Sequence, residues 1–84
     1  MINVLLIHAG RIPHYRVPIY GFLSNYLKKF NFALTVIADG IQPDNPHKVG
    51  FEYAEMPLSA LRIALFVHQR KMDVVIDYME LRHL

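Results

Sequence analysis

The chain alternates between short, nearly continuous apolar runs and longer segments in which apolar residues recur every three or four positions. Continuous runs rich in β-branched residues and leucine are typical of strands that are covered on both faces of a sheet. Such runs occupy residues 2–8, 32–38 and 73–78, and a shorter alternating run at 51–54 ends before Pro57. We therefore expect four strands at these places.

The first segment with helical spacing begins at Pro18, a residue that suits the first turn of a helix. Its apolar residues recur at three- and four-residue intervals, which predicts that they form the buried face. These residues are Ile19, Phe22, Leu23, Tyr26, Leu27 and Phe30, with Ser24, Asn25, Lys28 and Lys29 on the other side. Asn31 is expected to end this helix in a left-handed conformation.

A second helix is expected over residues 58–72, entered at Leu58 or Ser59. Its apolar stripe contains Leu61, Ala64, Leu65 and Met72. His68 shares that stripe, so we expect a partly buried structural histidine. Phe66 lies on the opposite side among arginines, where it either touches an anionic membrane surface or packs under a neighbouring element.

The order strand, helix, strand, short strand, helix, strand predicts an α/β fold with a right-handed parallel sheet and flanking helices, as in Rossmann-like domains. Residues 79–84 resemble the first turns of a further helix. A doubly wound domain usually has about two more strands after this point. We therefore expect residues 1–84 to be an incomplete domain.

Composition narrows the possible functions. The 84 residues include no cysteine, which excludes disulfides, thiolate metal sites and a cysteine nucleophile. The net charge of +2 is spread along the chain, so we expect no nucleic-acid partner. The apolar runs are too short to cross a bilayer and nothing suggests a signal for export, so we expect a cytoplasmic protein.

The loop after the first strand carries the strongest candidate chemistry. Ligands of open α/β sheets bind beyond the carboxyl ends of the strands. Gly10 would let a ligand approach the backbone, while Arg11, His14 and Arg16 would contribute positive charge and a titratable donor. This pattern indicates a cradle for an anion or a sugar phosphate. The alternative is a solvated basic loop, because neither GxGxxG nor a Walker A motif is present.

Other polar residues are less decisive. Asp77 and Glu80 follow the last strand, where they either accept hydrogen bonds from sugar hydroxyls or cap a helix. His8 is either a core imidazole or a group of the site. The five histidines lack metal-ligand spacing, so we expect no metal site and no cofactor.

The stretch AGRIPHYRVPIYGFL places P-x-[YF]-R before a proline-led helix with a Y-x-x-L pattern. This arrangement resembles the N-terminus of bacterial GT-B-type glycosyltransferases of the family 4, or group 1, kind. The resemblance continues through LKKFNFALTVIADG, QPDNPHKV and MDVVID, and so covers essentially the whole chain. These motifs are specific in combination and weak singly.

The resemblance implies two Rossmann-like domains, of which the N-terminal one receives a glycan or lipid-linked acceptor. The C-terminal one, which lies outside these residues, binds the nucleotide-sugar donor, so the isolated chain is expected to be inactive. Gly10 would lie by the donor diphosphate, and Arg11, His14 and Arg16 would face the acceptor or phosphate side. If the Phe66 side of the second helix touches a membrane, the protein would make peripheral contact with the inner membrane face.

One departure from the family leaves the catalytic residue unassigned. The family often has histidines after the fourth strand, where this chain has Asp77, Tyr78, Met79 and Glu80. A different class of function therefore stays open. The chain could be a non-catalytic α/β interaction module whose exposed sheet edge pairs with another chain.

Overall fold

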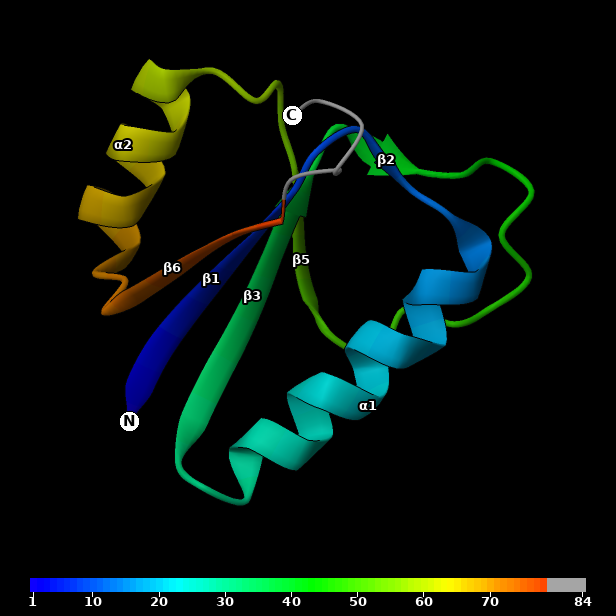
Figure 1. The fold of residues 1–84 in the computed structure, drawn as a ribbon, viewed down its shortest axis with the longest axis horizontal. Coiled ribbons are helices and arrows are strands. Elements are labelled where there is room, and N and C mark those ends of the chain that lie inside the picture. Colours follow the sequence, from blue (N-terminus) through cyan, green and yellow to red (C-terminus); the bar gives the residue numbers. More distant parts are fainter. Residues whose placement is uncertain (79–84) are drawn as a thin grey trace.

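The computed structural model describes residues 1–78, and Figure 1 shows their path. The elements in chain order are β1 (Ile2–His8), β2 (Arg11–Ile12), the 3-10 helix η1 (His14–Arg16), α1 (Val17–Lys28), β3 (Phe32–Ala38), β4 (Gly40–Ile41), β5 (Glu52–Glu55), α2 (Ala60–Arg70) and β6 (Val74–Tyr78). All four predicted strands and both predicted helices are present. The predicted loops contain two additional short strands, β2 and β4, and η1. The helix expected over residues 79–84 lies outside the described residues.

The main sheet has four parallel strands in the order β5-β3-β1-β6. Helix α1 lies on one face of this sheet and α2 on the other (Figure 1). Both faces of the central strands β1 and β3 are therefore covered, which explains why their sequences are apolar throughout. The α/β fold with a Rossmann-like parallel sheet and flanking helices is thus confirmed.

The core forms two layers, one on each face of the sheet. Alternate residues of β1 separate into the two layers: Val4 and Leu6 pack on the α1 side, whereas Leu5 and Ile7 pack on the α2 side. This separation follows from the two-residue period of a strand. The α1 layer also contains Phe51, whose ring meets that of Tyr20 edge-on at 5.7 Å.

The buried face of α1 differs from the predicted one. Its buried residues are Val17, Tyr20, Gly21 and Ser24, while most of the predicted apolar stripe is exposed. Small residues make this possible, because a β-carbon added to Gly21 would lie only 3.8 Å from the α-carbon of Gly50. The loop before β5 therefore packs closely against α1. Asn31 does adopt the predicted left-handed conformation, with φ 66°.

Helix α2 also buries a different face. Phe66 is buried against the sheet with Ile63, Val67 and Met72, whereas Leu61 and Leu65 are exposed. His68, predicted to be partly buried, is exposed. The apolar residues of α2 are spread around the helix, so three- and four-residue spacing alone does not determine which side meets the sheet.

Within residues 1–78, no helix is both long enough and apolar enough to cross a membrane.

Candidate functional site

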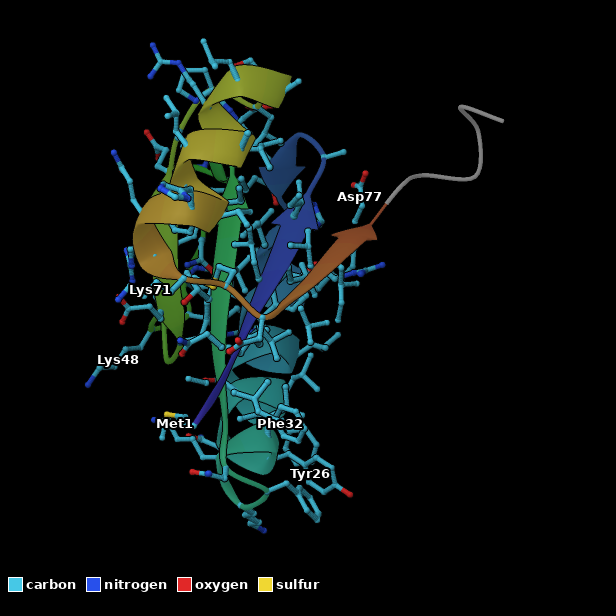
Figure 2. All side chains as sticks on the ribbon, turned by 90° about the vertical axis from the view of Figure 1, so that its left-hand side faces the viewer. Met1, Tyr26, Phe32, Lys48, Lys71 and Asp77 are labelled. Atoms are coloured by element: carbon cyan, nitrogen blue, oxygen red, sulfur yellow. The ribbon has the colours of Figure 1, made fainter. Side chains whose placement is uncertain are left out.

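The strand order creates a switch point between β1 and β6. From β1 the chain moves outward to β3 and then β5, and it returns through α2 to the other side of β1. The carboxyl ends of β1 and β6 lie side by side, with His8 paired to Tyr78 in the strand register. Figure 2 shows Asp77 at the same end of β6. Open α/β sheets bind ligands at such a switch point.

Gly10 turns the chain at this edge. Its φ of 81° is a conformation that L side chains rarely adopt, and a β-carbon built on it would meet no atom within 4 Å. The Gly10 carbonyl accepts a hydrogen bond from the Asp39 N–H at 3.2 Å, which connects the turn after β1 to the turn after β3. Gly10 therefore combines a defined backbone with open space around it, as the sequence predicted.

The small strands β2 and β4 lie beyond the carboxyl ends of β1 and β3. This end of the sheet, where the parallel strands finish, is here called the carboxyl edge. They pair in parallel, with Arg11 beside Gly40 and Ile12 beside Ile41. The Arg11 side chain is exposed, whereas Ile12 is fully buried. Arg11 thus presents its charge to solvent from a strand that is paired with β4.

His14 and Arg16 both lie in η1, immediately before α1. The backbone N–H of His14 donates to Oε1 of Gln42 at 3.0 Å, and its ring meets Tyr15 edge-on. Arg16 is half-buried, and its backbone N–H donates to the Pro13 carbonyl at 2.9 Å. These contacts stabilise the loop in which the predicted basic residues lie.

The N-terminus of α1 offers few free amides. The N–H of Val17, the first residue of the helix, donates to the His14 carbonyl, and Pro18 has no N–H. The 3-10 turn η1 therefore takes up one of the amides with which a helix N-terminus can bind an anion. Positive charge at this edge comes from Arg11 and Arg16 more than from helix amides.

His8 is a buried imidazole at the border of the site. It is almost fully buried, and its Nδ1 forms a hydrogen bond of 2.7 Å with the Tyr20 hydroxyl. Of the two alternatives for His8, the structure supports the core imidazole. Its position at the end of β1 places it directly beneath the turn at Gly10.

A group of residues at the same edge was missed by sequence reasoning. A β-carbon built at Gly40 would lie 3.4 Å from Oε1 of Glu55 and 3.9 Å from Cγ of Arg11, so these two side chains converge over Gly40. Glu55 ends β5 and is paired with Ala38, the last residue of β3. A carboxylate at the end of a predicted strand was the signal that could have indicated Glu55.

Tyr53 adds a perturbed ionisable group next to Glu55. Burial of the Tyr53 side chain, together with the negative charges of Glu55 and Asp39, raises its pKa to about 12. Within the described residues, the buried hydroxyl makes no hydrogen bond of ordinary geometry. Acidic and basic side chains therefore meet beyond the end of β3, where Glu55 and Arg11 converge over Gly40.

Two further predictions concern Glu80 and Phe66. Glu80 lies outside the described residues. Phe66 is buried, with the Arg70 guanidinium 5.1 Å from its ring centroid, so this residue does not present an aromatic surface to a membrane. A shallow hollow of about 220 Å³ lies next to it, lined by Met56, Arg62, Leu65, Phe66 and Gln69. None of the predicted site residues lines this hollow.

No group of three or more histidine, aspartate or glutamate side chains within residues 1–78 is arranged to hold a metal ion. Comparisons with protein-family models, with curated proteins and with solved structures find no match to this chain. The functional argument therefore depends on the sequence motifs and on the geometry of the carboxyl edge.

Proposed function

We propose that this chain is the acceptor-side, N-terminal part of a glycosyltransferase that moves a sugar from a nucleotide-sugar to a glycan or lipid-linked acceptor. The observation that carries the proposal is the turn at Gly10, which follows β1 at the switch point between β1 and β6, with Arg11 next to it on β2. A left-handed glycine with open space lets a phosphate or a sugar come close to the backbone. The resemblance of AGRIPHYR to the glycosyltransferase loop supports the same reading.

In this proposal the basic residues bind negative charge. Arg11 is exposed and mounted on a paired strand, so its guanidinium can reach a diphosphate or an anionic acceptor without a large loss of backbone freedom. Arg16 and His14 would bind from the neighbouring turn. Asp77 would accept hydrogen bonds from sugar hydroxyls on the β6 side.

Calorimetric titration of the chain tests the proposal. The ligands are a panel of nucleotide-sugars and a panel of glycan and lipid-linked acceptors, added to the wild type and to Arg11→Ala. Loss of a charged hydrogen bond should weaken binding of the preferred ligand about ten- to a hundredfold. Arg62→Ala is the matched control, because Arg62 is equally an exposed arginine but lies on α2.

A ligand that binds Arg11→Ala and Arg62→Ala equally well would contradict a site at the carboxyl edge. Absence of binding by every member of both panels would contradict the proposal as a whole.

One observation favours a second candidate, a non-catalytic interaction module. Strand β6 is at one end of the sheet in the described residues, and Val74, Val75 and Ile76 are each close to half exposed. An unpaired strand edge with apolar side chains can accept a strand from another chain. Concentration-dependent association that Val75→Lys abolishes, with no binding of either ligand panel, would favour this module.

A further inference from the structure

Exposed apolar side chains follow one side of helix α1 and continue just past its end. This row, here called the α1 ridge, consists of Ile19, Phe22 and Tyr26 on α1 and of Phe30, two residues after the helix, each about half exposed or more. Three of them follow one another in contact. The rings of Phe22 and Tyr26 stack with their centroids 6.2 Å apart, and the centroids of the Tyr26 and Phe30 rings are 5.3 Å apart. Phe22 is 72% exposed, although phenylalanine is usually buried.

The ridge faces away from the body of the protein. Its positions lie on the opposite side of the helix from Tyr20, Gly21 and Ser24, which pack against the rest of the chain. Figure 2 shows the Tyr26 side chain projecting outwards near the end of α1 that lies away from the carboxyl edge. A row of aromatic side chains along the outside of a helix is convex, so a partner must be either grooved or deformable.

The charged side chains of α1 itself are all positive. Asp39 is the first acidic residue of the chain, so every charged side chain in α1 and in the residues before it is basic. Lys28 and Lys29 are exposed beside the end of the ridge. An apolar row next to lysines, with no carboxylate on the same helix, is complementary to a surface that is apolar and anionic.

A second copy of the chain does not satisfy this charge pattern. If two ridges packed in parallel, Lys28 and Lys29 would meet the same residues of the other copy. If they packed antiparallel, these lysines would meet the positive end of the partner helix and its Arg16. Both arrangements place like charges together, which favours an anionic partner over self-association.

We propose that the α1 ridge docks this protein onto an anionic lipid bilayer. Phenylalanine and isoleucine would enter the boundary between headgroups and acyl chains, Tyr26 would keep its hydroxyl at the headgroup level, and the lysines would contact anionic headgroups. A bilayer deforms around a convex row of side chains, whereas a protein partner would need a preformed groove. Docking by the α1 ridge is independent of the glycosyl transfer proposed above.

Co-sedimentation with vesicles tests the docking surface. The wild type should bind vesicles of equimolar phosphatidylcholine and phosphatidylglycerol more tightly than vesicles of phosphatidylcholine alone, and added salt should weaken this preference. Phe22→Ser should lower the partition onto anionic vesicles about tenfold, because one exposed phenylalanine no longer enters the membrane. Leu61→Ser is the matched control, since Leu61 is 71% exposed but lies on α2.

A fluorescent reporter provides a second readout. The chain contains no tryptophan, so Phe22→Trp and Leu61→Trp each introduce a single fluorophore at an exposed site. Addition of anionic vesicles should shift the emission of Phe22→Trp to the blue and leave that of Leu61→Trp almost unchanged. Circular dichroism of every variant checks that the fold is retained.

Three results would overturn the proposal. The first is equal binding of the wild type, Phe22→Ser and Leu61→Ser to anionic vesicles, or no binding at all. The second is an equal blue shift at both reporter positions. The third is sedimentation equilibrium in which the wild type is a dimer without vesicles and Phe22→Ser is a monomer, which would assign the ridge to a second copy.

Discussion

The imidazole Nδ1 of His8 and the hydroxyl of Tyr20 lie 2.7 Å apart in the interior, and this hydrogen bond joins the end of β1 to the buried face of α1. The two rings also meet edge-on, with centroids 5.9 Å apart. His8 ends β1, two residues before the turn at Gly10. Its hydrogen bond therefore fixes the position of the helix relative to the candidate site.

Tyr20→Phe removes this hydrogen bond and keeps the ring. The free energy of unfolding should fall by about 0.5–1.5 kcal/mol, the net value of one intramolecular hydrogen bond. Urea denaturation followed by circular dichroism measures the change. Tyr26→Phe is the control, because Tyr26 lies on the exposed side of the same helix and should lose almost nothing. Equal losses in both variants would contradict a specific role for the pair.

Gly10→Ala probes the backbone of the turn. Alanine at φ 81° should cost about 1–2 kcal/mol of stability. A β-carbon there would meet no atom within 4 Å, so this cost comes from the backbone alone. Gly50→Ala should be neutral or slightly stabilising. Gly50 has no positive φ, and a β-carbon built on it would lie 4.0 Å from its nearest neighbour, the α-carbon of Gly21. In thermal melts, the melting temperature should therefore fall in Gly10→Ala and should stay the same or rise slightly in Gly50→Ala.

Ser59→Ala removes the N-cap of α2. The Ser59 hydroxyl accepts a hydrogen bond from the Arg62 N–H at 3.3 Å, and no acidic residue lies in the first turn. The distance is long, so the loss of stability should be near the low end of cap substitutions, about 0.5–1 kcal/mol. Ser59→Asp should restore or exceed wild-type stability, because aspartate also caps and its charge is favourable at a helix N-terminus. A melting temperature that is equal in all three proteins would contradict the cap.

The strands were predictable because one physical property determines them. Strands β1 and β3 are covered on both faces, and a continuous apolar run has few other structures available to it. The turn at Gly10 was predictable for a similar reason, since a glycine between a strand and a basic loop commonly allows a sharp change of direction. These features depend on local sequence.

The helix faces were not predictable from hydrophobic spacing. On α1 the protein buries Gly21 and Ser24, which periodicity ranks below Phe22, because small residues let the loop at Gly50 pack against the helix. Glu55 and Tyr53 were missed at the candidate site for a related reason. They lie near Arg11 and Asp39 only because β5 pairs with β3. The sequence of neither strand alone predicts which strand it pairs with.

Tyr53 predicts a specific dependence of stability on pH. Its pKa is about 12 in the folded chain, above the ordinary value of 10.0, because burial and the charges of Glu55 and Asp39 disfavour the phenolate. Between these two pH values the unfolded chain has lost the proton and the folded chain still holds it. Stability contributed by this group is therefore fully present below the ordinary pKa and is lost as pH rises through the folded one.

Urea denaturation at a series of pH values across this range, with the wild type and Tyr53→Phe, measures the effect. The slope of stability against pH should be less negative in Tyr53→Phe, because phenylalanine has no proton to lose. Below the range the variant should be as stable as the wild type or slightly more so, since the buried hydroxyl makes no hydrogen bond of ordinary geometry within residues 1–78. Tyr26→Phe, which removes an exposed tyrosine on α1, is measured alongside for comparison. Parallel slopes for the wild type and Tyr53→Phe would show that the Tyr53 hydroxyl does not ionise differently in the folded and unfolded chains.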